Sequence, residues 1–539
     1  MNPTLLIVIV VYIAATLGLG YLAYRRTHSE KDYLIAGGNV HPYLMAMAYG
    51  STFISTSAIV GFGGNAGMFG MSLLWLTVFN IFVGIFIAFV VFGKRTLIVG
   101  RNLGAQTFPE FLGLRFKSRF IKHFSATLVA VAMPLYAAAV MIGGARFLEQ
   151  ILHINYNWAV WIFALFVGAY VLTGGLKGVV YTDALQGTIM FFGMVTLLIM
   201  TYAKLGGIIP AHEALTALTA QVPAALAAKG HLGWTSMPAF LSEYWWIVVS
   251  TLVMGVGIGV LAQPQLVVRY LTVKSPRELN RAVVIGGVFI LFMTGVAFVV
   301  GALTNVHFMQ QSGQLALMAA IDPVTHAPNV DKIIPLYIDS AMPGWFTYIF
   351  TLTLLAAAMS TMSGQFHVIG TSISRDLYES LRKKDGKGNS LLINRIGLVV
   401  AMIVTVWLTF RLPAGIIAVA TTTFMGTCAA AFLPAYTAAL YWPRVTRIGA
   451  IASMVIGTFT TLFLLVFVYA KGSAGLGISM ALFGKATLAG FPWTVIEPIA
   501  IALPLSAVVL VAVSLATEPA EAHIMKRLLV PIGTVASEE

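Results

Sequence analysis

The stretch YGSTFISTSAIVGFGGNAGMFG, residues 49–70, decides the fold of this chain. Hydroxyl-bearing side chains fill its first half, and glycines follow in its second half, among them Gly61, Gly63, Gly64 and Gly67. A second stretch of this kind, VVSTLVMGVGIGVLAQPQLVVRY, spans residues 248–270 and contains Gly255, Gly257, Gly259 and Pro264. A helix that breaks inside a membrane exposes backbone amides and carbonyls, which only protein or a water-filled cavity can accommodate. The two stretches therefore predict two helices that are interrupted halfway across a membrane.

The composition supports a membrane protein. The chain has 539 residues, of which 59% are hydrophobic and only 9% charged, with a mean hydropathy of +0.90. Soluble domains carry roughly one quarter charged residues, so an ordinary water-soluble protein is excluded. One span needs about 20 apolar residues, and the sequence predicts an all-α polytopic protein with thirteen spans, the first of which we expect to be retained. The spans are predicted at 3–24, 43–70, 72–95, 121–152, 157–173, 179–203, 242–268, 281–304, 345–374, 391–410, 414–441, 447–470 and 492–516.

Cysteine and charge usage narrow the class further. The single cysteine, Cys428, excludes an internal disulfide, and no Cys/His spacing resembles a zinc, iron-sulfur or haem site. The net charge of +13 reflects Lys and Arg gathered in alternate loops, which indicates orientation in the lipid and not a nucleic-acid partner. This pattern predicts an inner (plasma) membrane protein with its N-terminus outside and its C-terminus in the cytoplasm. Two arginines that close spans, Arg146 and Arg269, are expected to extend to an interface.

The two interrupted spans lie five spans apart. Paired broken helices at matching positions in two halves indicate an inverted-repeat transporter with its site at the membrane midplane. We therefore predict one transporter domain over 1–539, with a first repeat at 43–203 and a second at 242–441. Residues 1–24 add an N-terminal helix and residues 447–516 add C-terminal helices. The alternative is that the glycines only allow close helix packing, as small residues do in membrane helices.

The ninth predicted span contains AAAMSTMSGQF, residues 356–366. Helical spacing places Ala357, Ser360, Thr361 and Gly364 on one face of this span. Hydroxyls, together with carbonyls freed by a broken helix, suit a hard cation such as sodium. The alternative is that these hydroxyls bond their own helix or a neighbouring one.

Two ionisable residues also fall within predicted spans. Asp183 follows GGLKGVVYT, and an acid at that depth is costly and is by default a functional candidate. It could attract or bind a cation or carry protons, or it could form an ion pair with Lys177 or another loop base. His367 could relay protons, although a neutral packing histidine is favoured because its helix shows no second titratable residue nearby.

Four motifs resemble the sodium/solute symporter family: STFISTSAIVGFGG, GGLKGVVYTDALQG, AQPQLVVRY and AAAMSTMSGQF. The resemblance runs from DYLIAGG at Asp32 to RDLY at Arg375 and continues more weakly to the eleventh span. It implies the inverted-repeat fold of the bacterial leucine transporter, with sodium between the first broken helix and the ninth span. It further implies sodium ligation by the backbone carbonyls of Ser51, Ile54 and Ala357 and the hydroxyls of Ser360 and Thr361. Asp183 would assist sodium binding, or release toward the cytoplasm.

The motifs AQPQLVVRY and GGARFLE resemble the branch that carries proline, pantothenate and short monocarboxylates. Half-helix N-termini favour an anionic group, and the stretches 55–58 and 255–259 supply hydroxyls and bare backbone without fixed charge. The predicted substrate-binding residues are Ser55, Thr56, Ser57, Gly255, Gly257 and Gly259. No tryptophan stands just after Ser55, where the proline carriers that this chain resembles have one nearby.

We therefore predict a sodium-coupled symporter, surrounded by membrane lipid, that imports a small organic solute, with a short monocarboxylate favoured. The alternatives are a sodium-coupled proline or pantothenate symporter and a proton-coupled carboxylate carrier that uses Asp183 or His367. A membrane enzyme is not expected, because no nucleophile, base and orienting residue form a recognisable catalytic set. Sodium stoichiometry and oligomeric state remain open.

Overall fold

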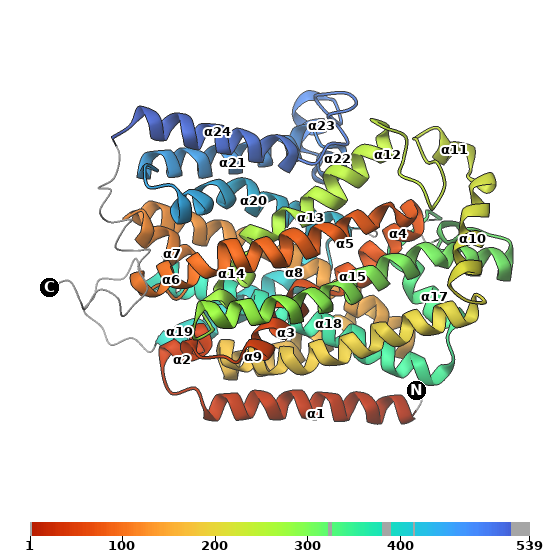
Figure 1. Ribbon diagram of the computed structural model, residues 1–539, viewed down its shortest axis with the longest axis horizontal. Helices are drawn as coiled ribbons and strands as arrows, with labels where there is room; N and C mark the ends of the chain where they lie inside the picture. The colour runs from red at the N-terminus through yellow and green to blue at the C-terminus, as the bar shows by residue number, and fades with distance from the viewer. Residues whose placement is uncertain (1–2, 153, 322–325, 380–389, 413–415, 519–539) are drawn as a thin grey trace.

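The computed structural model describes residues 3–152, 154–321, 326–379, 390–412 and 416–518 (Figure 1). Over these residues the chain is helical, with two isolated β-bridges and no strand. The long helices lie roughly parallel, and the beginning of α1 (Pro3–Arg25) and the end of α24 (Ile499–Ala516) lie at opposite ends of the molecule. Some of the basic residues used to predict orientation, including Lys526 and Arg527, lie outside the described residues.

Eleven helical segments in the described part of the chain are long and apolar enough to cross a membrane. They are Pro3–Arg25, Ser57–Leu103, Arg119–Glu149, Gly175–Lys204, Glu243–Ala262, Pro276–Ser312, Gly344–Tyr378, Leu392–Thr409, Ile417–Tyr441, Arg447–Phe467 and Ile499–Ala516. The predicted span 157–173 corresponds to a shorter apolar helix, Tyr156–Ala169. The predicted span 43–70 corresponds to a helix broken into pieces. The all-α polytopic class is confirmed, while the count of thirteen spans stays a prediction.

The elements of the predicted first repeat are α3 (Pro42–Phe53), η2 (Ser57–Phe62), α4 (Gly63–Phe69), η3 (Gly70–Leu73), α5 (Leu74–Ile81), η4 (Phe82–Gly93), α6 (Lys94–Leu103), α7 (Phe108–Arg115), α8 (Arg119–Leu152) and α9 (Tyr156–Lys204). Those of the predicted second repeat are α12 (Glu243–Trp246), η6 (Ile247–Met254), α13 (Gly255–Gly257), η7 (Gly259–Ala262), α14 (Pro264–Tyr270), α15 (Pro276–Ser312), α16 (Ala316–Ala319), η8 (Val330–Lys332), α17 (Ile333–Ala341), α18 (Gly344–Thr371), η9 (Ser372–Glu379), α19 (Ser390–Thr409) and α20 (Ile417–Tyr441).

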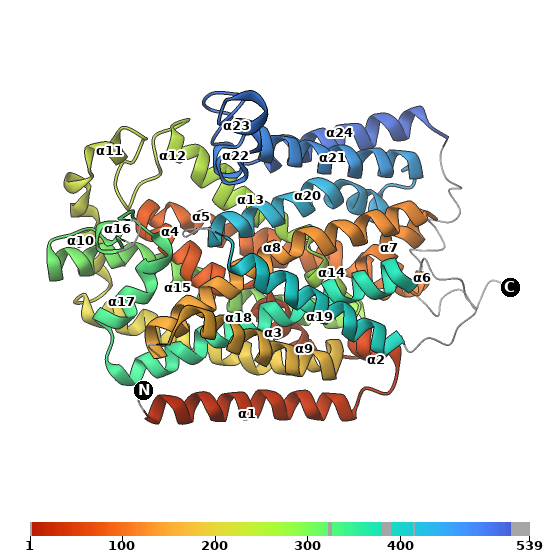
Figure 2. The same cartoon turned by 180° about the vertical axis from the view of Figure 1, so that it is seen from behind.

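The remaining elements flank or connect these two sets. They are α1 (Pro3–Arg25), α2 (Glu30–Ile35), η1 (Ala36–Gly38), α10 (Ile208–Ala217), η5 (Leu218–Gln221), α11 (Ala224–Ala227), α21 (Arg447–Phe467), α22 (Ala470–Leu476), α23 (Ile478–Phe483) and α24 (Ile499–Ala516). Helix α1 covers one side of the molecule, and the pair α21 and α24 covers the opposite side, as both views show (Figures 1 and 2).

The first broken helix loses its regular backbone at the predicted place. Helix α3 ends at Phe53, and Ile54 is extended, with φ −90° and ψ 102°. The amides of Ala58 and Ile59 both bond the carbonyl of Ser55, and the chain resumes as a π-helix at Ser57. Carbonyls before Ser55 are thereby released from the ordinary ladder of i to i+4 bonds.

The second broken helix is interrupted over a longer stretch. The π-helical η6 passes into the three residues of α13 and then into the 3-10 turn η7. Gln263 is extended, with φ −75° and ψ 115°, before Pro264 begins α14. Both predicted interruptions are therefore present in the structure.

Helix α9 contains two of the predicted spans, joined by a sharp kink at Gly175. The backbone there has φ 55° and ψ −155°, which side-chain-bearing residues rarely adopt. A Cβ atom on Gly175 would also lie 2.4 Å from the ring of Tyr33. The kink lets one continuous run of helix turn back across the molecule, so that α9 packs against both α3 and α18.

Candidate cation and solute sites

Helix α18 presents its two predicted hydroxyls to the break of the first helix. The Oγ of Ser360 donates to the carbonyl oxygen of Ser51 at 2.8 Å and also contacts the carbonyl of Ala357 at 3.2 Å. The Oγ1 of Thr361 donates to the carbonyls of Thr52 at 3.1 Å and Ser51 at 3.4 Å. All of these residues except Thr52 were predicted from hydroxyl chemistry or resemblance alone, and Ser51 meets Ser360 although about 300 residues separate them in sequence.

Ile54, the remaining predicted carbonyl ligand, ends α3 in an extended conformation. Its amide still closes the last turn of α3 by bonding Gly50 at 2.8 Å. Among the hydrogen bonds of the described residues, none joins Ile54 to Ser360 or Thr361. Its place in a ligand set therefore stays a prediction.

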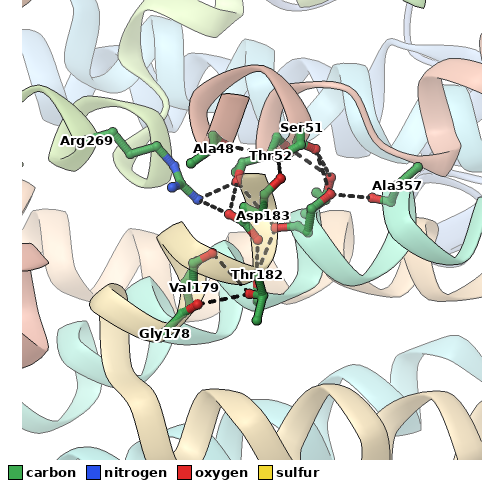
Figure 3. A network of polar contacts seen from close by, with 12 residues as sticks. Ala48, Ser51, Thr52, Gly178, Val179, Thr182, Asp183, Arg269 and Ala357 are labelled. Carbon is green, nitrogen blue, oxygen red and sulfur yellow. Dashed lines mark hydrogen bonds and ion pairs between the residues drawn. The ribbon is translucent and has the colours of Figure 1, made fainter. Parts of the chain in front are cut away.

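Asp183 lies behind this cluster of oxygens and is fully buried (Figure 3). Its Oδ2 accepts hydrogen bonds from Arg269 Nη2 at 2.8 Å and from Thr52 Oγ1 at 3.0 Å. Its Oδ1 accepts from Ser363 Oγ at 3.1 Å, and its backbone carbonyl accepts from Ser51 Oγ at 3.1 Å. Asp183 thus fixes α3, α14 and α18 relative to α9.

The expectation that Arg269 extends to an interface is wrong. Its side chain is 1% exposed, forms an ion pair with Asp183 and donates to the hydroxyl of Thr52. Asp183 does form an ion pair, as one of the alternatives predicted, but its partner is Arg269 and not Lys177. Lys177 instead pairs with Asp32 at 2.6 Å. This pairing could not be predicted from the order of residues, because 86 residues separate Asp183 from Arg269.

The other two flagged residues lie away from the cluster of oxygens. His367 is 2% exposed, and its ring centroid lies 5.6 Å from that of Tyr33, the packing arrangement that was favoured for it. Arg146 is about half exposed and pairs with Glu149 at 2.9 Å.

A small cavity of about 20 Å³ lies beside the first break. This is room for about one water molecule, so the cavity in this structure is too small for an organic solute. Its lining contains no charged side chain. The lining residues are Phe53, Ile54, Ser55, Ala58, Phe62, Leu76, Asn80, Tyr136, Val256, Thr294, Phe298, Thr421 and Met425.

Of the predicted substrate residues, Ser55 lines this cavity. Thr56 instead donates to the carbonyl of Val140 at 2.9 Å, and Ser57 bonds Ser55 Oγ through its amide at 3.1 Å. The three glycines of the second break allow close packing: Cβ atoms on Gly255, Gly257 and Gly259 would lie within 3.1 Å of Thr422, Phe79 and Met425. Substrate contact stays a prediction for all six residues, Ser55 included.

Sequence reasoning missed the polar residues that other helices contribute to the cavity. Asn80 on α5 is 2% exposed, and its amide oxygen has no hydrogen-bond partner. Thr294 and Thr421 come from α15 and α20, and each donates its hydroxyl hydrogen to its own helix. A lone Asn in the predicted third span was the only available signal for Asn80.

Comparison with known proteins settles the class. The profile of the sodium:solute symporter family matches residues 33–457, which is most of the chain. The chain belongs to the sodium:solute symporter family. It is 28% identical to the sodium/pantothenate symporter of Haemophilus influenzae, over 85% of this chain and 89% of that protein. It is 27% identical to the high-affinity proline transporter PutP of Bacillus subtilis, over 82% of this chain and 88% of that protein.

A solved structure shares the fold. A substrate-bound, outward-open Na+-coupled sialic acid symporter superposes with a TM-score of 0.75 at 18% identity, covering 97% of this chain and 99% of the other. The predicted leucine-transporter type of fold is therefore confirmed. As a member of the sodium:solute symporter family, the chain is a polytopic membrane transporter and not an enzyme, and sodium is its co-transported ion.

Proposed function

We propose that this symporter imports a short monocarboxylate together with sodium across the inner membrane, with its N-terminus outside and its C-terminus in the cytoplasm. The sodium site comprises the carbonyls of Ser51, Ile54 and Ala357 and the hydroxyls of Ser360 and Thr361. The observation that carries this proposal is the contact of both hydroxyls with carbonyls next to the break in the first helix.

Sodium can enter this cluster without a large rearrangement. Each hydroxyl has one hydrogen and two acceptor lone pairs, and the hydrogen can rotate. Ser360 and Thr361 now direct their hydrogens at the carbonyls of Ser51 and Thr52. When sodium arrives, these hydrogens turn away, and hydroxyl and carbonyl oxygens face the ion together, as hard cations require.

Asp183 supports this site from a neighbouring position, because its carboxylate already has other partners. Its carboxylate oxygens already accept three hydrogen bonds, from Thr52, Ser363 and Arg269. The nearby negative charge favours a cation, while the guanidinium of Arg269 limits how strongly it does so. A balance of this kind suits an ion that must bind on one side and leave on the other.

The lining of the cavity beside the break suits a small anion, which can enter only after the cavity widens from its present room for about one water molecule. Ser55 Oγ accepts bonds from the Ser57 amide at 3.1 Å and from the Tyr136 hydroxyl at 3.4 Å, so its own hydrogen is free to donate. The amide group of Asn80 supplies further donors. These neutral donors can hold one carboxylate, and the phenylalanine, leucine, valine and methionine side chains of the lining suit a short apolar tail.

A second candidate solute is proline or pantothenate. The named relatives are a pantothenate symporter and a proline transporter. Asn80 Oδ1 is a buried acceptor without a partner, and it could accept an N–H group of either compound. The absence of a tryptophan after Ser55 argues against proline.

Sodium binding and solute binding are coupled because both proposed sites use the same segment of chain. The proposed sodium ligand Ser51 and the proposed solute ligand Ser55 lie four residues apart across the same break. Sodium that orders this segment pre-forms the solute site, and the solute must raise sodium affinity by the same factor. The helices around the break then rock to open the site to the other side.

The sodium assignment is tested with Ser360→Ala plus Thr361→Ala. In proteoliposomes we expect sodium-stimulated uptake to be abolished, because two of the proposed ligands are lost. Thr351→Ala is the matched control, since Thr351 lies on the same helix, is buried and bonds only its own turn. Unchanged sodium dependence in the double variant would refute the site. An imposed pH gradient without sodium tests the proton-coupled alternative through Asp183 or His367, which alone predicts accumulation under those conditions.

The solute is identified by uptake of a labelled panel of short monocarboxylates, proline, pantothenate and a sugar, each with and without an inward sodium gradient. We expect sodium-driven accumulation of a monocarboxylate. Accumulation of proline or pantothenate alone would select the second candidate.

A further inference from the structure

Glu497 lies where three parts of the fold meet, two residues before α24 begins. Its amide donates to Ser250 Oγ of the broken η6 at 3.1 Å. Its carboxyl group receives a hydrogen bond from the hydroxyl of Tyr469, which itself lies 3.4 Å from Thr251 of η6. On the third side, a Cβ on Gly426 of α20 would lie 3.5 Å from Glu497 Oε1. The elements α22 and α23 lie near the beginning of α24, away from the end of the molecule at which α24 finishes (Figures 1 and 2).

This carboxyl group is buried with little compensation. Its residue is 1% exposed, and Oε2 has no hydrogen-bond partner. Within the described part of the chain no ion pair includes Glu497. Burying an isolated carboxylate is costly, whereas a neutral acid is tolerated.

The charged groups near Glu497 do not offset the free-energy cost of burying its carboxylate. Lys471 of α22 attracts the carboxylate, but the two form no ion pair in the described part of the chain, so the attraction offsets burial only in part. Glu243 of α12 and Lys229 pair with each other at 3.0 Å. Neither η6 nor α20 contributes a charged side chain. Burial therefore raises the pKa of Glu497 to about 8, against the smaller opposing effects of Lys471 and the Tyr469 hydroxyl.

We propose that Glu497 is a proton-binding site on the outer side of the transporter, and that its proton holds α24 and α20 closed against the second broken helix. The neutral acid fits the dry junction that these elements form. Any arrangement in which water reaches Glu497 lets the group ionise. Protons outside the membrane thereby favour the closed junction, whichever solute is carried.

The direction of the pH effect follows from the raised pKa. Stability of the closed junction is fully present at low pH, where the group is protonated in either arrangement, and it is lost as pH rises through about 8. Between the ordinary value of 4.5 and about 8, opening releases one proton. The equilibrium between open and closed junction then changes by up to about tenfold per pH unit.

The test places a thiol in the junction and measures its reaction with N-ethylmaleimide. Ile499 is 1% exposed and contacts Gly426, so Ile499→Cys in a Cys428→Ala background reports separation of α24 from α20. Leu482→Cys on the exposed face of α23 gives the intrinsic pH dependence of the reagent at the same end. The quantity compared is the labelling rate at 499 divided by that at 482, measured at pH values from well below to above the expected midpoint.

We expect this ratio to rise severalfold with pH when Glu497 is present and to stay flat in Glu497→Gln. Glu243→Gln, which removes a partly exposed acid nearby, should leave the rise unchanged. A flat ratio in both backgrounds, or an equal rise in both, overturns the proposal. If Glu497→Gln does not fold, Tyr469→Phe replaces it: loss of a hydrogen bond to the carboxylate should move the midpoint to higher pH, and an unmoved midpoint also overturns the proposal.

Discussion

The buried ion pair between Asp183 and Arg269 should be one of the strongest single constraints on the fold around the sodium site. We consider Arg269→Met, which keeps a long apolar side chain but removes the guanidinium group. The two partners are 0% and 1% exposed and their atoms lie 2.8 Å apart, so solvent screens them little. Opposite charges about 4 Å apart interact by about 4 kcal/mol at an effective dielectric constant near 20.

Removal of one partner of a buried pair costs about 3–5 kcal/mol, because the other charge is left buried. We therefore expect Arg269→Met to lower the free energy of unfolding by about this amount, less whatever Thr52 and Ser363 recover by bonding Asp183. Adding Asp183→Asn removes the stranded charge, so the double variant should be more stable than Arg269→Met alone.

The measurement is a double-mutant cycle on the purified protein in micelles, with unfolding followed by tryptophan fluorescence. The expected coupling energy is about 3 kcal/mol. Arg146→Met is the control: its pair with Glu149 is about half exposed, and it should cost less than about 1 kcal/mol. Effects of the two substitutions that simply add, within about 0.5 kcal/mol, would contradict the reasoning.

Three further predictions test other parts of the molecule. Asn80→Leu should raise the KM for the solute roughly 10-fold or more with little change in sodium affinity, because a hydrogen bond to a charged group contributes about 1.5–3 kcal/mol; an unchanged KM removes Asn80 from the solute site. Gly301→Ala should abolish folding or transport, since its Cβ would lie 2.1 Å from the carbonyl of Gly63, whereas Gly287→Ala, with open space around it, should behave as wild type in expression and uptake. Burial acts to raise the pKa of Asp32, but hydrogen bonds from Lys177, Ser29 and the His28 amide together lower it below 3.8. The Asp32→Asn variant should therefore have a lower melting temperature than wild type at pH 6. This difference should vanish as the pH falls below 3.8, where the carboxylate becomes protonated.

The sequence predicted the fold because the signals for it are local. Apolar runs of membrane length and the two glycine-containing interruptions can be read directly from the order of residues, and the structure contains both. The kink at Gly175 also lies in the right place, since the prediction put two spans, 157–173 and 179–203, where α9 runs. What the pattern did not indicate was the π-helical geometry of η2, η4 and η6, because the choice between i+4 and i+5 bonding depends on packing with neighbours.

The site was predictable only in part. Ser360 and Thr361 stood out as hydroxyls in an apolar helix, and their approach to Ser51 follows from the family fold. The role of Arg269 could not be predicted, because an arginine at the end of an apolar run usually reaches an interface, and only three-dimensional packing shows that this one faces Asp183. Asn80 and Glu497 could not be predicted for the same reason, since each is buried by elements that are distant in sequence.

The arrangement of these groups bears on why sodium and solute move together. Thr52 donates to Asp183 and lies next to Ser51, whose carbonyl receives the Ser360 hydroxyl. A displacement of the first broken helix toward the inside or the outside must therefore disturb the ion pair, the oxygen cluster and the Ser55 hydroxyl at once. Because all three are fixed to the seven residues from 51 to 57, the protein cannot open one proposed site to water while the other stays formed. A coupling of this kind requires no communication over long distances. It requires only a backbone segment that lacks regular helical hydrogen bonds and whose carbonyls bond side chains from other helices.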